Sequence, residues 1–160
     1  MERKPKILAV SSDREFVKAT DKALKPSYEL DAAYTREEAQ AKAVKSPDLI
    51  ILGYLQPRGT SFELHRQLRR EPATKDIPLL IVDVRPEEHL QKGWRRNEGM
   101  QMDADDYVSQ PIAPAELRKT IGKILQRASQ EPMEMSEVLA QMEDALNRID
   151  RIEAGLGVAK

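Results

Sequence analysis

Short runs of apolar residues alternate with longer polar stretches through most of the chain. The runs are partly β-branched, and each is followed by a polar stretch that is compatible with a helix. Nearly continuous apolar strands are typical of a parallel sheet that is covered by helices on both faces. The pattern therefore predicts five βα units, with strands at Ile7–Val10, Tyr28–Ala33, Leu49–Leu52, Leu79–Val82 and Tyr107–Val108.

The expected helix starts carry recognisable capping residues. Pro86 and Pro114 suit the first turn of the fourth and fifth helices, where a missing N–H does no harm. Gly93 and Gly99 interrupt the segment between Arg85 and Asp103, so we expect an irregular fourth helix there. A Ser or Thr followed three residues later by Glu can pair the free amides of a helix start, as in Ser12 with Glu15, Thr35 with Glu38, and Thr60 with Glu63.

A different pattern begins after residue 132. Apolar residues recur there at alternating spacings of three and four, which is the repeat of a coiled coil. Leu139 and Leu146 widen the apolar face, so folding back onto the domain remains an alternative to self-association. We expect self-association, with a seam made by Met135, Val138, Met142, Ala145, Ile149 and Ile152. The predicted organisation is an α/β domain over 1–128, a linker over 129–132, a dimerisation helix over 133–154 and a tail over 155–160.

Composition and charge exclude several classes of protein. Charged residues make up 33% and apolar residues 40% of the chain, and no apolar stretch is long enough for a membrane span. With 26 basic and 27 acidic residues, there is no broad electrostatic attraction for nucleic acid. The absence of cysteine fits the reducing cytoplasm. We therefore expect a cytoplasmic protein that binds neither membranes nor nucleic acid.

The α/β part resembles the bacterial response-regulator receiver domain between Lys6 and Arg127. Four segments carry this resemblance: Pro47–Leu52, Pro57 with Phe62–Leu64, Ile77–Val82, and Ala104–Ile112. The resemblance implies a flavodoxin-like, doubly wound fold with a five-stranded parallel sheet of order 2-1-3-4-5 and, here, a C-terminal coiled-coil-like helix.

The same resemblance implies a phosphorylation site whose residues are missing. The family uses an aspartate acceptor, an acidic pair for Mg²⁺, a hydroxyl residue and a lysine. The acceptor position falls on Gly53, the acidic pair on Ser11 and Ser12, the hydroxyl position on Asp83 and the lysine position on Gln110. None of these side chains suits its role, so the sequence predicts a degenerate receiver site without a catalytic residue, a cofactor or a metal ligand.

Three further residues have a place in this interpretation. Tyr107 occupies the position of the family's switch aromatic, and we expect it to pack in a fixed pose because the trigger is missing. His65 and His89 lack the spacing of a zinc site and are expected at the surface or its boundary. The sequence leaves open whether the Gln110–Pro111 peptide is cis.

The leading hypothesis is a non-enzymatic signalling adaptor, a pseudo-receiver that acts through protein–protein contacts. The expected partners are a kinase, a receiver or a regulator, together with a second copy of the chain as a homodimer. A flavodoxin-like domain that binds a small ligand in the crevice at the strand ends is the alternative, and a transcriptional regulator is disfavoured because one terminal helix is too short for a helix-turn-helix.

Overall fold

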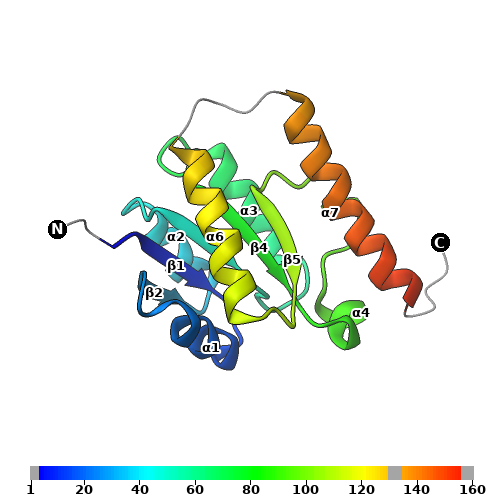
Figure 1. Ribbon diagram of the computed structural model, residues 1–160. Coiled ribbons are helices and arrows are strands. Elements are labelled where there is room, and N and C mark those ends of the chain that lie inside the picture. The colour runs from blue at the N-terminus through cyan, green and yellow to red at the C-terminus, as the bar shows by residue number, and fades with distance from the viewer. Residues whose placement is uncertain (1–3, 130–134, 156–160) are drawn as a thin grey trace.

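A computed structural model describes residues 4–129 and 135–155 of the 160-residue chain (Figure 1). In the last helix the side chains are described from residue 140 to residue 153. The elements in chain order are β1 (Lys6–Val10), α1 (Arg14–Leu24), β2 (Glu29–Ala33), α2 (Arg36–Ala43), β3 (Leu49–Leu52), α3 (Thr60–Arg70), β4 (Leu79–Asp83), the 3-10 turn η1 (Pro86–Glu88), α4 (His89–Lys92), α5 (Arg96–Gly99), β5 (Asp106–Ser109), α6 (Pro114–Ala128) and α7 (Met135–Gly155).

The five strands form one parallel sheet in the order β2-β1-β3-β4-β5, which confirms the predicted flavodoxin-like fold. Successive side chains of each central strand enter opposite layers. One layer packs under α1 and α6, and the other packs under α2 and α3. The central strands β3 and β4 are buried along their whole length, which explains their unbroken apolar sequence.

Two of the three predicted helix caps differ from the structure. Thr35 caps α2 as predicted, because its hydroxyl accepts the amide of Glu38. Asp13 rather than Ser12 caps α1, since its carboxylate is a stronger acceptor for two amides of the first turn. At α3 the residue before the helix is Gly59, whose φ of 99° lies in the left-handed region that favours glycine.

The segment between β4 and β5 is as irregular as predicted. It contains η1 and two helices of four residues each, α4 and α5. Gly93 ends α4 where a side chain would collide with the imidazole of His89. These short pieces leave part of the sheet face at β5 without the long helix that α2 and α3 provide elsewhere.

The last helix fills that gap. α7 contacts α5 and β5, and the side chains of Ala145 and Ile149 are buried in the same core as the α2 and α3 side chains. These two residues of the predicted self-association seam are covered by their own domain, and the seam itself stays a prediction. Met142 and Ile152 are half-buried, and the side chains of Met135 and Val138 lie outside the described residues. In the structure α7 folds back onto its own domain, which is the alternative that the sequence left open.

On each of the two outermost strands, one residue has its backbone amide and carbonyl bonded to side chains in the same way. On β2, the amide of Ala32 donates to Asp31 (2.8 Å), and its carbonyl accepts from Lys42 of α2 (2.6 Å). On β5, the amide of Tyr107 donates to Asp106 (2.8 Å), and its carbonyl accepts from Arg148 of α7. At these residues the strand edge is less able to pair with a strand of another molecule. α7 thus completes β5 as α2 completes β2.

Replacing Ile149 with Ala tests whether α7 is part of the domain core. We expect the free energy of unfolding to fall by about 2–5 kcal/mol, because a fully buried branched side chain leaves a cavity. Ile152→Ala, at a half-buried position one turn further on, is the matched control and should cost about 1 kcal/mol. Urea denaturation followed by circular dichroism measures both, and equal losses would contradict the packing described for Ile149.

Candidate functional site

The predicted receiver positions lie where β1, β3, β4 and β5 end at their carboxyl sides. Gly53 follows β3, and its amide donates to the carbonyl of Val10 (2.7 Å). A Cβ atom at Gly53 would lie 3.0 Å from Cε2 of Phe16 and 3.2 Å from Cβ of Ser11. The ring of Phe16 and the side chain of Ser11 therefore lie close around the position where the sequence places the acceptor.

Ser11 and Ser12 are engaged with the neighbouring backbone. The hydroxyl of Ser11 donates to the carbonyl of Tyr54 (3.0 Å). The hydroxyl of Ser12 donates to the carbonyl of Tyr34 (3.4 Å) and accepts the amide of Gln56 (3.1 Å). These bonds tie the loop after β1 to the ends of β2 and β3, which is a structural use of both hydroxyls.

Asp83 points away from this pair and is tied to the β5 side of the sheet. Its carboxylate accepts the hydroxyl of Tyr107 (2.6 Å), the amide of Trp94 (3.0 Å) and the amide of Val84 (2.8 Å). Burial raises the pKa of Asp83, and the hydrogen bond from Tyr107 opposes that rise. Burial also raises the pKa of Tyr107, with Asp83 adding to the effect. Tyr107 is thus fixed inside the core.

The remaining predicted position, Gln110, belongs to a different hollow. It lines a groove of about 510 Å³ between α1 and α6, and the Gln110–Pro111 peptide is cis. Asp83 lines a cavity of about 10 Å³ beside Tyr54 and Trp94, which has room for roughly one water molecule. The structure therefore brings Ser11 and Gly53 together but places Asp83 and Gln110 in separate hollows.

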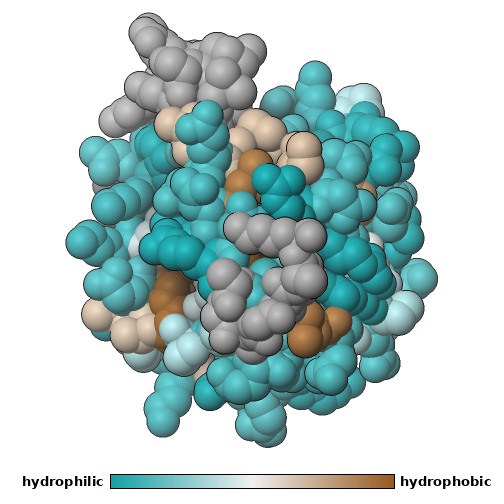
Figure 2. All heavy atoms as spheres, turned by 90° about the vertical axis from the view of Figure 1, so that its right-hand side faces the viewer, coloured by the Kyte–Doolittle hydropathy of each residue, from teal (hydrophilic) through white to brown (hydrophobic). Residues whose placement is uncertain are grey.

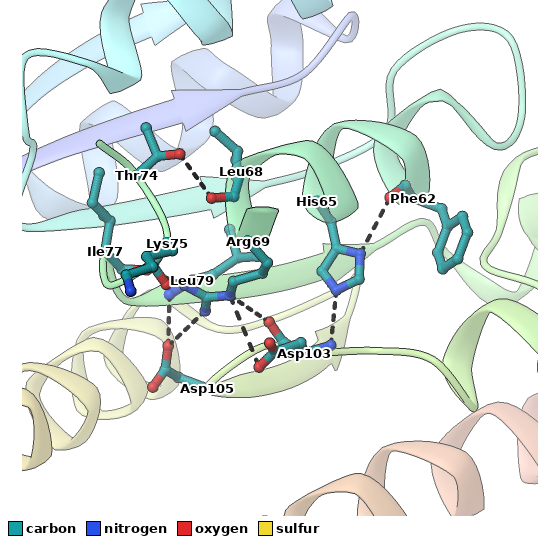
Figure 3. Close-up of polar contacts among 10 residues, drawn as sticks. All are labelled: Phe62, His65, Leu68, Arg69, Thr74, Lys75, Ile77, Leu79, Asp103 and Asp105. Atoms are coloured by element: carbon teal, nitrogen blue, oxygen red, sulfur yellow. Dashed lines mark hydrogen bonds and ion pairs between the residues drawn. The ribbon is translucent and has the colours of Figure 1, made fainter. Parts of the chain in front are cut away.

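Both histidines are buried, with 1% of each side chain exposed, so the prediction of surface or boundary positions is wrong. Nε2 of His65 accepts the amide of Asp103 (2.8 Å), and Nδ1 lies 3.2 Å from the carbonyl of Phe62 (Figure 3). An imidazole that accepts at one nitrogen and donates at the other is neutral. Burial lowers the pKa of His65 in agreement with this arrangement. Trp94 packs edge-on against both His65 and Phe62.

Arg69 is a half-buried polar centre that the sequence did not predict. Its guanidinium donates to the carbonyls of Asp103 (2.7 Å), Lys75 (2.9 Å) and Ile77 (2.7 Å), and pairs with the carboxylate of Asp105 (3.4 Å) (Figure 3). These bonds fasten the end of α3 to the loops that precede β4 and β5. The two basic residues that end α3 fit a helix C-terminus, but nothing in the sequence says which of them turns inward.

Within residues 4–129 and 135–155, no three His, Asp or Glu side chains are arranged to hold a metal ion. Nor is any helix in these two ranges long and apolar enough to cross a membrane.

The chain is similar to several known signalling proteins, although no family model matches it. The phosphate regulon transcriptional regulatory protein PhoB of Shigella flexneri is 36% identical over 110 residues, which cover 68% of this chain and 45% of PhoB. The alkaline phosphatase synthesis transcriptional regulatory protein PhoP of Bacillus subtilis is 31% identical over 125 residues, covering 77% of this chain and 49% of PhoP.

Solved structures agree with these relatives. A response regulator from Chloroflexus aurantiacus superposes with a TM-score of 0.67 at 27% identity, over 78% of this chain and 100% of that one. The chemotaxis protein CheY4 of Vibrio cholerae gives 0.62 at 28% identity, over 76% of this chain and 99% of CheY4. The chain belongs to the response-regulator receiver family. This receiver spans less than half the length of the curated relatives named above.

Gly53→Asp tests how closely the receiver crevice is packed. We expect a loss of about 1–3 kcal/mol of unfolding free energy, because the new side chain meets the ring of Phe16 and loses hydration. When Phe16 is already replaced by Leu, adding Gly53→Asp should cost less unfolding free energy than it costs in the unchanged chain. Urea denaturation measures all four chains, and a single variant as stable as the unchanged chain would show that the crevice has space to spare.

The buried neutral state of His65 predicts a loss of stability in acid. The unfolded chain takes up a proton as the pH falls through 6.5, while the folded chain resists protonation because its pKa is lower. The stabilisation by neutral His65 is therefore complete above pH 6.5 and declines below it. Unfolding free energies at about pH 7.5 and about pH 5 should differ less in His65→Gln than in the unchanged chain. An identical decline in both would contradict this role of His65.

Proposed function

We propose that this receiver is a signalling adaptor that works without being phosphorylated. The observation that carries the proposal is the packing at Gly53. Gly53 offers no carboxylate. A Cβ atom added to Gly53 would lie 3.0 Å from the ring of Phe16. An acyl phosphate requires a carboxylate that faces an open, charge-lined crevice. The carboxylate is absent at this position, and a side chain added there would fit only if the ring of Phe16 shifted.

The other receiver positions support the same proposal. Mg²⁺ prefers carboxylate ligands, whereas the hydroxyls of Ser11 and Ser12 are bonded to carbonyl groups of the backbone. The carboxylate of Asp83 receives hydrogen bonds from Tyr107 of β5 and from the amides of Val84 and Trp94, and a carboxylate there would repel a phosphoryl group. Gln110 supplies no cation. We infer that the fold has been kept while its chemistry has been lost.

The groove between α1 and α6 offers a surface for a protein partner. Its floor is apolar and includes Phe16, Ala23 and Leu117, while its rim carries charged side chains. A protein interface combines an apolar centre with such a rim. Three rim residues are acidic and would repel a nucleic-acid backbone, so the groove fits a kinase, receiver or regulator better. The rim charges are Asp13, Glu15, Glu88 and Arg85.

The proposed organisation is a receiver over 1–128, joined by a linker over 129–132 to the helix over 133–154 and a tail over 155–160. The expected homodimer stays a prediction. Small-ligand binding is less favoured at Asp83, because the adjoining cavity holds only about 10 Å³. Transcriptional regulation, which the names of PhoB and PhoP state, is not carried over to this chain, because fewer than half of their residues are matched.

Incubation with Mg²⁺ and a small phosphodonor such as acetyl phosphate tests the proposal. We expect the intact mass to remain unchanged, since no activated acceptor is present. A receiver that has an aspartate at the acceptor position is the positive control under the same conditions. Gly53→Asp should also stay unmodified, because the acidic pair and the lysine are still missing. A stoichiometric adduct of about 80 Da on the unchanged chain would refute the proposal.

A further inference from the structure

One peptide group at the receiver crevice is held from two sides. The carbonyl of Gly93 accepts a hydrogen bond from Nε of Arg58 (2.7 Å), and the amide of Trp94 donates to the carboxylate of Asp83 (3.0 Å). This peptide follows α4, whereas Arg58 lies in the loop between β3 and α3 and Asp83 ends β4. The Gly93–Trp94 peptide therefore joins the ends of two neighbouring strands. We call this group the peptide clamp and define it by these four residues.

The clamp begins where the pairing of β3 with β4 ends. The last paired residues of these strands are Leu52 and Ile81. Arg58 and Asp83 lie beyond this pair, at the carboxyl ends of the strands where the receiver crevice lies. The hydrogen bonds of the clamp thus continue a connection that the strands themselves no longer make.

Arg58 also closes the end of α4. A second nitrogen of its guanidinium, Nη1, donates to the carbonyl of Leu90 (2.7 Å). The last carbonyls of a helix have no partner within the helix, so a side chain that bonds two of them fixes the helix end. A guanidinium presents its donors as a planar fork, which a lysine ammonium cannot do. Arginine is therefore the cation that suits this position.

Gly93 lets the chain pass close to α4. A Cβ atom at this position would collide with Nδ1 of His89 and would lie 2.8 Å from the carbonyl oxygen of the same residue. Because one of these neighbours is backbone, a larger residue would push the chain away from α4 and move its carbonyl away from Arg58. The glycine that interrupts the predicted fourth helix is thus required by the clamp.

The carboxylate of Asp83 extends the clamp to β5. Its Oδ2 atom accepts both the amide of Trp94 (3.0 Å) and the hydroxyl of Tyr107 (2.6 Å). All three residues are buried, with at most 5% of each exposed. Hydrogen bonds in such an interior are stronger than in water and polarise one another. A connected chain of hydrogen bonds therefore runs from the loop after β3 through the peptide and Asp83 to β5.

The side chain of Trp94 anchors the clamp in the core. Its ring packs edge-on against the rings of Phe62 (5.7 Å between centroids) and His65 (5.4 Å), both on α3. Figure 2 shows the side of the molecule that carries α4 and α7, where hydrophilic residues dominate and hydrophobic ones form small separate areas. Trp94 is buried and belongs to the core rather than to this surface. The peptide that precedes it is therefore held by packing as well as by hydrogen bonds.

We propose that the peptide clamp is a conformational lock in which Arg58 is the positioning residue. While Arg58 holds α4, the ends of β3 and β4 and the ring of Tyr107 keep one arrangement, and no bound group is needed to fix them. When Arg58 is released, this part of the crevice opens locally and the rest of the sheet stays folded. The proposal goes beyond the adaptor function, because the lock acts on the domain itself, whichever partner the domain binds.

The length of α4 supports local opening. The helix has four residues, and so short a helix is not stable without contacts to the rest of the protein. Local opening occurs preferentially in segments that few interactions hold in place. Removal of the two bonds from Arg58 should therefore affect α4 and the peptide after it before it affects the sheet.

The test follows amide hydrogen exchange by NMR in the full chain and in two variants. Arg58→Ala removes both bonds to α4, whereas the matched control Arg70→Ala removes an exposed arginine at the opposite end of α3. In Arg58→Ala, the amides of Trp94 and Val84, which donate to the carboxylate of the clamp, should exchange about tenfold faster than in the unchanged chain. The amide of Ile51 in the centre of the sheet should keep its rate, and the control should keep all three rates.

Two outcomes overturn the lock. An unchanged rate at Trp94 shows that Arg58 does not hold the peptide. An equal acceleration at Ile51 shows a loss of overall stability, which any structural residue would cause. If circular dichroism shows that Arg58→Ala is unfolded, Arg58→Lys takes its place, because it keeps the charge and loses the fork. Exchange at Trp94 should then be about threefold faster, with the rate at Ile51 again unchanged.

A further variant tests the extension to β5. Tyr107→Phe removes the hydroxyl that shares an oxygen atom of Asp83 with Trp94. Because the bonds of one network support each other, the acceleration at Trp94 in Arg58→Ala/Tyr107→Phe should be smaller than the product of the two single accelerations. Equality with that product indicates independent sites and overturns the connected chain. None of these outcomes alters the phosphodonor result, so a failure of the lock leaves the adaptor function standing.

Discussion

An edge strand of a buried sheet needs two kinds of cover: apolar contacts over its core-facing side chains, and partners for its outward backbone groups. At β5 the segment that follows β4 provides only part of the apolar cover, through Trp94 and Met102, because α4 and α5 have four residues each. α7 provides both, through Ala145 and Ile149 on one side and Arg148 on the other. The irregular fourth helix, the folded-back terminal helix and the capped strand edge are therefore aspects of one arrangement.

The same arrangement fixes Tyr107 inside the core. The hydroxyl of Tyr107 donates to the carboxylate of Asp83, and its carbonyl accepts from Arg148. Both the side chain and the backbone of this β5 residue are therefore fixed. A carboxylate at position 83 would oppose phosphoryl chemistry, but it suits a buried phenol that must find an acceptor. Asp83 thus acts here as the acceptor that holds the buried hydroxyl of Tyr107.

Sequence patterns were sufficient for the sheet and insufficient for the buried polar contacts. Strand positions follow from apolar runs because a central strand such as Leu49–Leu52 is buried on both faces and needs no polar residues. The sequence did not decide what α7 packs against, since an apolar stripe on a helix looks the same whether it meets a second helix or a sheet edge. His65, His89 and Arg69 were missed because their partners are backbone groups or side chains far along the chain. The cap at α1 was off by one residue, where Ser12 and Asp13 are both plausible acceptors.

The two edge caps differ in where their donors lie in the sequence. Lys42 lies 10 residues after the carbonyl that it covers on β2, whereas Arg148 lies 41 residues after the one that it covers on β5. The contact on β2 therefore comes from the helix that is next in the sequence, whereas the contact on β5 needs a helix beyond α6. A chain that lacks α7 leaves this part of the β5 edge open, so truncation before α7 should favour aggregation.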